Sequence, residues 1–144
     1  MTVEIRAQGH EASADEEAIG EEAIGLCVRR FYERAQKDLM LARIFEVSVP
    51  DWEHHISKIH DFWSRALLGT QRYEGFPFPP HMRLPVEPEH FERWLALFEG
   101  TARETLSPAL AEKAIERARH MATAFQAGIF PYVGKDGRPS RLPE

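Results

Sequence analysis

A proline-rich but apolar segment near the middle of the chain limits the folds that this sequence can adopt. Residues 72–88 read RYEGFPFPPHMRLPVEP, with prolines at positions 77, 79, 80, 85 and 88. Proline lacks a backbone donor and clashes inside a helix, so no continuous helix crosses this segment. Most loops run over the surface in water, yet this one carries large apolar residues: Tyr73, Phe76, Phe78, Met82, Leu84 and Val86. The segment therefore requires an apolar partner, and His81 lies in its middle.

Four amphipathic patterns surround this segment, with apolar residues at the spacings of three and four that make one helix face. The first predicted helix covers about residues 17–39, and the second runs from Trp52 to a stop at Gly69. The third begins near Glu89, and the fourth begins after Ser107, which is its N-cap. Residues 39–50 are predicted to be a modest connection that contains a helical turn around LARIFE. No convincing strand pattern is present, so the predicted class is all-α.

Composition narrows the class of protein. The 144 residues suggest one domain, and the net charge of −5 argues against a nucleic-acid partner. The single cysteine, Cys27, excludes an internal disulfide and fits a reducing compartment. No apolar run reaches the length of a membrane span, so we expect a cytoplasmic protein without a membrane partner. Residues 1–17 are predicted to be a mobile tail, 18–133 the domain, and 134–144 a loose tail.

Helix angles separate two adjacent histidines of the second predicted helix. At about 100° per residue, His55 falls on the face of Trp52, Ile59 and Trp63, whereas His54 points the opposite way. His55 is therefore predicted to face inward, and His54 to face solvent.

Three polar side chains lie within apolar helix faces: Tyr32, His55 and Trp94. Each brings a polar hydrogen into the interior and needs an acceptor. Each one alone is more often an ordinary core residue, and a loop histidine such as His81 is more often a surface residue than a ligand. Together they describe one cavity, with polar groups from three helices and a histidine on an apolar loop.

The composition of this cavity distinguishes among cofactors. A di-iron site needs repeated Glu-x-x-His motifs, and the one candidate, Glu87 to His90, contains Pro88 and has no second copy. A structural zinc site needs more cysteines, and no nucleophile elbow or phosphate-binding glycine loop is present. Haem needs one axial imidazole, apolar walls and a few polar hydrogens on the far side of the iron. A haem would explain the apolar loop, with His81 as the axial ligand.

Six residues are predicted to contact the haem: Lys58, Tyr73, Phe76, Met82, Leu84 and Phe91. Lys58 lies one turn from His55 toward the helix surface, where it could pair with a haem propionate or simply be solvated.

Four motifs occur in order along the chain: FYERAQKD, WEHHISKIHDFW, HMRLP and HFERWLALF. They contain a Phe-Tyr pair, a Trp-x-x-His, a His-x-x-Leu-Pro and a Trp-Leu-x-Leu-Phe. In this combination the chain resembles the truncated haemoglobins of group III over about residues 20–130. It also resembles them in lacking the Gly-Gly motifs that other truncated globins carry near the ends of two helices.

The resemblance implies a truncated globin, a two-over-two helical sandwich around haem b. It assigns roles to six residues: His81 as proximal ligand, Tyr32, His55 and Trp94 as polar distal residues, and Phe31 and Ile59 as apolar positions over the ligand.

The resemblance also implies a function, the reversible binding of O2, CO and NO at ferrous iron. The alternative is a redox enzyme, an NO dioxygenase or a peroxidase-like protein, with an external reductase; no catalytic residue is assigned. We expect a monomer or weak dimer.

Overall fold

The computed structural model describes the backbone of residues 2–143 and the side chains of residues 15–46 and 48–143. The helices are α1 (Thr2–Lys37), α2 (Leu39–Ser48), α3 (Trp52–Leu68), α4 (Phe78–Met82), α5 (Pro88–Thr105) and α6 (Pro108–Ile129). Two short strands, β1 (Tyr132–Val133) and β2 (Pro139–Ser140), follow α6 and pair antiparallel. None of the described helices is long and apolar enough to cross a membrane.

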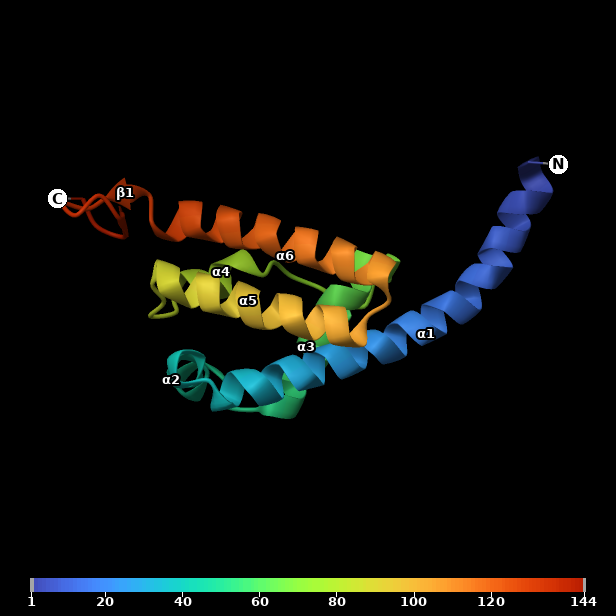
Figure 1. Cartoon of the computed structure of the whole chain (residues 1–144), viewed down its shortest axis with the longest axis horizontal. Helices are drawn as coiled ribbons and strands as arrows, with labels where there is room; N and C mark the ends of the chain where they lie inside the picture. The colour runs from blue at the N-terminus through green and yellow to red at the C-terminus, as the bar shows by residue number, and fades with distance from the viewer. Residues whose placement is uncertain (1, 144) are drawn as a thin grey trace.

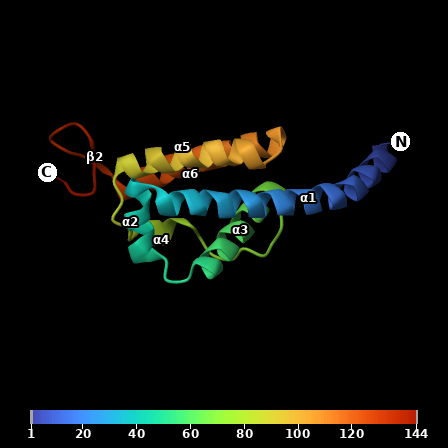
Figure 2. The same ribbon diagram turned by 60° about the horizontal axis from the view of Figure 1, so that its bottom comes forward.

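The four long helices form two layers of two. α1 packs against α3 and α5, and α6 packs against α5 and α3. α5 and α6 run side by side in Figure 1, and Figure 2 shows α3 beneath α1. The predicted all-α, two-over-two arrangement is confirmed.

The core contains a region packed by small residues and a region packed by aromatic rings. Ala102 of α5 and Ala114 and Ala118 of α6 have no exposed surface, so the backbones of these two helices can approach closely. Nearby, the ring of Trp63 stacks on that of Phe98 with centroids 4.8 Å apart. This aromatic layer forms one wall of the cavity described below.

Local sequence signals set the helix ends. The Asp51 carboxylate accepts from the backbone N–H of His54 at the start of α3, and the Ser107 hydroxyl accepts from that of Leu110 at the start of α6. α3 ends at Gly69, whose φ of 77° is the left-handed conformation that glycine adopts easily. The predicted limits of these helices are confirmed.

Two predicted boundaries are wrong. α1 begins at Thr2 rather than near Glu17, so its backbone is helical through most of the predicted tail; the side chains of residues 1–14 lie outside the described part. Residues 39–48 form the complete helix α2 because the Asp38 carboxylate accepts from the backbone N–H groups of Met40 and Leu41. This N-cap signal was available in the sequence.

The proline-rich segment contains a short helix rather than only loop. α4 carries Pro79 and Pro80 in its first turn, where their missing N–H groups cost no helical hydrogen bond. The prolines thus start the helix that bears His81, and Pro85 lies beyond its end.

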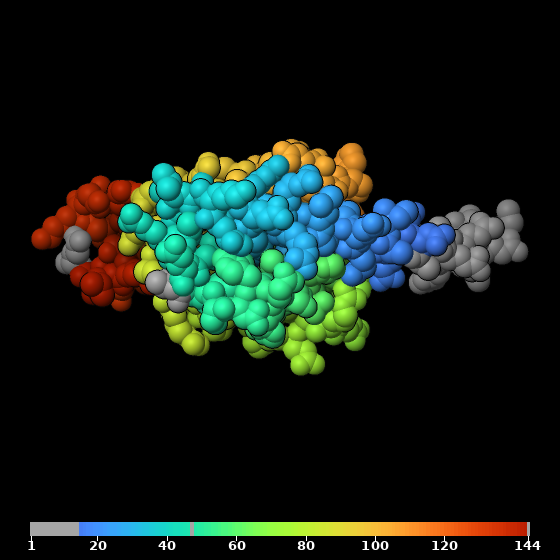
Figure 3. Space-filling view, turned by 90° about the horizontal axis from the view of Figure 1, so that it is seen from below, coloured from blue at the N-terminus to red at the C-terminus, as the bar shows by residue number. Residues whose placement is uncertain are grey.

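The prediction of a chain without strands is also wrong. Tyr132 pairs with Ser140 and Val133 with Pro139, and Gly137, with a φ of 82°, lies in the turn between the strands. Figure 3 shows this segment at the end of the molecule farthest from the coloured start of α1, beside the start of α5. The mobility predicted for both tails stays a prediction.

A polar cluster joins α1, α3 and the segment after α3. The Glu21 carboxylate accepts from the Ser64 hydroxyl, from Arg72 Nη2 at 2.7 Å and from His60 Nε2 at 3.1 Å. Burial by itself raises the pKa of Glu21, but the hydrogen bonds from these three residues outweigh it and lower the pKa overall. The cluster fixes residues 69–72, and the next residue, Tyr73, packs edge-on against Phe62 with centroids 5.3 Å apart.

α4 packs onto α6 through one ring and one glycine. A Cβ added at Gly128 would lie 2.5 Å from Cζ of Phe78, closer than atoms normally approach. The Phe78 ring also contacts that of Phe125, with centroids 5.4 Å apart. The absence of a side chain at Gly128 therefore determines how closely α4 approaches α6.

We expect Gly128→Ala to lower the free energy of unfolding by about 1–3 kcal/mol, the usual cost of overpacking, because Phe78 or the whole of α4 must move. Urea unfolding of the purified protein measures this. Gly100→Ala is the matched control, since nothing lies within 4 Å of its added Cβ. Alanine's helix propensity should there stabilise the protein by up to about 1 kcal/mol. If both substitutions change the free energy of unfolding equally, the contact with Gly128 does not restrain Phe78.

Candidate functional site

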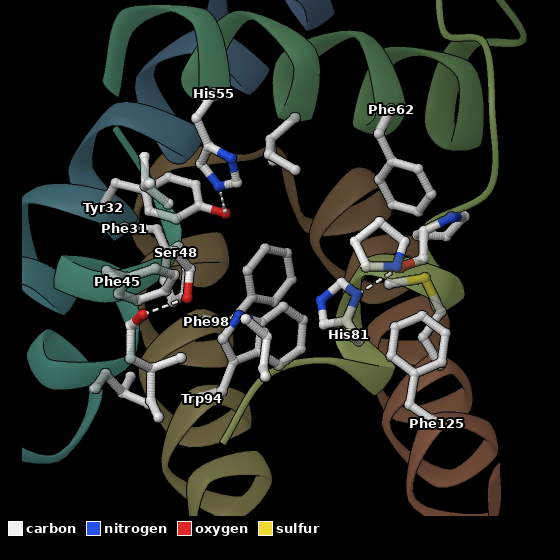
Figure 4. Close-up of a pocket in the computed structure, with 18 of the residues that line it drawn as sticks. Phe31, Tyr32, Phe45, Ser48, His55, Phe62, His81, Trp94, Phe98 and Phe125 are labelled. Atoms are coloured by element: carbon white, nitrogen blue, oxygen red, sulfur yellow. Dashed lines mark hydrogen bonds between the residues drawn. The ribbon is translucent and has the colours of Figure 1, made fainter. Parts of the chain in front are cut away.

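A cavity of about 340 Å³ is lined by residues of all six helices and of the segments on both sides of α4. Pockets that hold small molecules and cofactors measure about 300–1,000 Å³. Its walls are mostly aromatic and aliphatic, and Figure 4 shows its few polar side chains on opposite sides. The cavity therefore suits a large apolar ligand that meets polar groups at two places.

His81 supplies the polar group on one side. Its Nδ1 lies 2.5 Å from the carbonyl oxygen of Pro77, one turn earlier in the chain. The ring of Phe125 lies next to the imidazole, with centroids 4.8 Å apart. Figure 4 shows the other ring nitrogen facing across the cavity. A carbonyl can only accept, so Nδ1 carries the hydrogen in the neutral ring and Nε2 keeps a lone pair directed into the cavity.

The protonation of His81 favours this role. Burial lowers the pKa of His81, although the hydrogen bond to the Pro77 carbonyl acts in the opposite direction. The neutral imidazole is the form that binds a metal, and a hydrogen bond at the second nitrogen fixes its tautomer and orientation.

Tyr32 and His55 meet on the opposite side of the cavity. The Tyr32 hydroxyl lies 3.1 Å from His55 Nε2, and both side chains line the cavity (Figure 4). His54, the preceding residue, is exposed. The prediction that His55 faces inward and His54 outward is confirmed.

Both groups are held neutral. Burial raises the pKa of Tyr32 well above its ordinary value, so the phenol keeps its hydrogen. Burial is the largest cause that lowers the pKa of His55, and the positive charge of nearby Lys58 acts in the same direction. In their neutral forms either oxygen or nitrogen can be the donor of the shared hydrogen bond, depending on the tautomer of His55.

Trp94 contributes a third polar hydrogen from α5. Its indole ring is nearly parallel to that of Phe98, with centroids 5.3 Å apart and 4° between the planes. The ring of Phe31 meets it edge-on at 5.8 Å. These aromatic contacts fix the orientation of the indole at the cavity wall.

Most of the predicted site residues line this cavity. They are Phe31, Tyr32, His55, Lys58, Ile59, Tyr73, Phe76, His81, Leu84, Phe91 and Trp94. Met82 is the exception: it is absent from the lining, and about half of its surface is exposed. Met82 lies next to His81 on the one-turn helix α4, so its side chain leaves in another direction.

Sequence reasoning missed two groups of lining residues. Leu41, Ile44, Phe45 and Ser48 reach the cavity from α2, which was predicted as a connection; the Asp38 cap was the signal for this helix. Met121 and Phe125 of α6 also line the cavity. They belong to the predicted apolar face of that helix, but periodicity alone does not say which core residues border a cavity.

Comparisons with known proteins bear on the identity of this site. The family model described as Bacterial-like globin matches residues 16–130. The group 3 truncated hemoglobin ctb of Campylobacter jejuni is 35% identical over 123 residues, which cover 82% of this chain and 97% of that protein. The crystal structure of a group III truncated hemoglobin from Campylobacter jejuni matches with a TM-score of 0.74 and 34% identity, over 79% of this chain and 94% of the other. The chain belongs to the group III truncated haemoglobins.

Membership of the globin family implies a haem cofactor and small gaseous ligands. The cavity of this truncated haemoglobin fits such a group. It offers an imidazole nitrogen with a free lone pair on one side, apolar walls, and polar hydrogens on the other side.

The two adjacent histidines provide a test of the site. We expect His55→Leu to change the rates of O2 association and release, because it removes the hydrogen-bond partner of Tyr32. His54→Leu should leave both rates within about twofold of wild type, since surface substitutions away from the site have small effects. Flash photolysis and stopped-flow mixing measure these rates. A comparable change in both variants would contradict the placement of His55.

Proposed function

We propose that this truncated haemoglobin holds haem b with His81 as its only protein ligand to iron, and reversibly binds O2, CO and NO on the side of Tyr32, His55 and Trp94. The observation that carries the proposal is the hydrogen bond between His81 Nδ1 and the Pro77 carbonyl. It directs Nε2 into an apolar cavity whose opposite side holds the Tyr32–His55 pair.

The walls and rim of the cavity support haem in particular. Tyr73, Phe76, Leu84 and Phe91 offer flat or branched apolar surface to a porphyrin. Lys58 is exposed and also lines the cavity, so its ammonium can reach a propionate at the rim. When bound, the haem iron supplies one open coordination position for a diatomic gas.

The Tyr32 hydroxyl is the principal donor to a ligand in the cavity. If His55 carries its hydrogen on Nε2, it donates to the Tyr32 oxygen and leaves the phenolic hydrogen free to point at the ligand. The Trp94 indole, held by Phe98 and Phe31, supplies a second donor. Such fixed dipoles stabilise partial negative charge more strongly in an apolar cavity than in water.

The same pocket supports a second candidate, an NO dioxygenase. Several donors around one ligand favour slow O2 release, which suits a protein that consumes O2 better than one that transports it. The reaction would convert NO and O2 to nitrate, with one electron from an external reductase for each turnover. Nitrate formation from NO in the presence of a reductant distinguishes this enzyme from a carrier.

His81→Ala tests the proximal assignment. Because it removes the only proposed protein ligand, we expect the purified variant to be mostly haem-free, with partial recovery of haem on addition of imidazole. The ratio of haem absorbance to protein absorbance measures this. His120→Ala, an exposed position on α6, is the control and should keep full haem. Full haem retention and an unchanged spectrum in His81→Ala would exclude His81 as the ligand.

Tyr32→Phe tests the donor assignment, because it keeps the ring and removes only the hydroxyl. A hydrogen bond to a group with charge contributes about 1.5–3 kcal/mol, so O2 release should become roughly 10- to 100-fold faster. CO carries less charge in the pocket, and its release should change less. Stopped-flow measurements give both rates.

Tyr73→Phe is the matched control, since it removes a hydroxyl from another wall of the same cavity. It should leave both release rates unchanged. If Tyr32→Phe shifts O2 and CO release by the same factor, the residue acts through its shape, and the electrostatic role of Tyr32 is wrong.

A further inference from the structure

Residues 82–86, directly after His81, have backbone carbonyls that the local chain cannot satisfy. α4 ends at Met82, and the last carbonyls of a helix lack partners within the helix. Pro85 and Pro88 have no N–H to offer. Val86 is nevertheless buried, with 6% of its surface exposed. Buried carbonyls need donors, so the donors for this segment must come from elsewhere in the chain.

Arg141, beyond β2, supplies these donors. Its Nη1 lies 3.3 Å from the carbonyl oxygen of Met82, and its Nη2 lies 2.6 Å from that of Leu84 and 2.9 Å from that of Val86. The planar guanidinium has five N–H donors in a fixed arrangement, so it can bind several carbonyls at once. Lysine carries its donors on a single nitrogen and cannot reproduce this geometry.

Two further contacts hold Arg141 in place. Its guanidinium carbon lies 5.3 Å from the ring centroid of Phe130, a buried residue at the end of α6, within the range of a cation–π contact. Arg138, in the turn of the same hairpin, forms an ion pair with Glu89 in the first turn of α5. The C-terminal segment is therefore attached both to the carbonyls of residues 82–86 and to α5.

The carbonyls that Arg141 binds belong to the segment that positions His81. The backbone N–H of Leu84 donates to the His81 carbonyl oxygen at 3.2 Å. Leu84 and Val86 also line the cavity that His81 faces. His81 is thus restrained on its N-terminal side by the Pro77 carbonyl and on its C-terminal side by the segment that Arg141 holds.

Arg141 lies outside the part of the chain that the globin family model matches, which ends at residue 130. We propose that Arg141 is a positioning residue for the proximal histidine: through the carbonyls of residues 82–86 it sets the orientation of His81 toward the haem iron, and with it the strength of the iron–histidine bond. This inference rests on the proposed function, because it takes His81 as the ligand.

Arg141→Ala in the haem-loaded full chain tests the inference. In the ferrous protein without gas, the iron–histidine stretching band in resonance Raman should shift and broaden. Transfer of haem to an acceptor apoprotein should become roughly tenfold faster, the factor given by one hydrogen bond to a charged group. Arg141→Lys should fall between alanine and wild type. If the alanine variant does not fold, the band and the transfer rate of Arg141→Lys are compared with those of wild type instead.

Two controls separate positioning from a general loss of stability. Arg119→Ala removes an exposed arginine of α6 that pairs with Glu99, and it should leave the band and the transfer rate at wild-type values. The C–O stretching frequency of the CO form reports on the Tyr32 side and should stay near wild type in Arg141→Ala. Similar changes on both sides of the haem would indicate a structural role only and overturn the inference.

The outcomes also separate this inference from the proposed function. If His81→Ala retains haem with unchanged coordination, the proposed function fails. If His81 proves to be the ligand but the iron–histidine band of Arg141→Ala matches that of Arg119→Ala, only the role of Arg141 is wrong.

Discussion

The site depends on the hydrogen bond between His81 Nδ1 and the Pro77 carbonyl. This single contact fixes both the tautomer and the direction of the imidazole, since the carbonyl can only accept. It exists because α4 brings residues 77 and 81 one turn apart, and α4 begins where Pro79 and Pro80 tolerate the absence of N–H partners. A segment whose prolines forbid a long helix therefore provides the short helix that directs an imidazole nitrogen with a free lone pair into the cavity.

The rest of the fold surrounds this nitrogen with apolar walls and places polar hydrogens opposite it. Tyr32 comes from α1, His55 from α3 and Trp94 from α5, so these three polar groups come together only when the two layers are packed. Aromatic stacking orders these side chains: Trp94 lies on Phe98, which lies on Trp63. The side of His81 is held differently, through Gly128 and Phe78 behind α4 and through backbone carbonyls after it.

Much of this arrangement could be predicted from the sequence, because it follows from periodicity and residue chemistry. Helix angles separated His55 from His54, and apolar residues among prolines indicated a wall rather than a surface loop. Of the features that the sequence did not predict, two could not be read from any residue pattern. The exposure of Met82 follows from its direction on a one-turn helix, which has no periodicity to read. The contacts of Arg141 are made with backbone carbonyls, which every sequence has, so no residue pattern marks them.

A crystal structure of the haem-loaded protein tests the account most directly. The account predicts that His81 Nε2 coordinates the iron while Nδ1 stays on the Pro77 carbonyl, and that Tyr32, His55 and Trp94 lie on the opposite face of the porphyrin. Iron coordinated by another residue, or a His81 imidazole turned so that Nδ1 leaves Pro77, would contradict it.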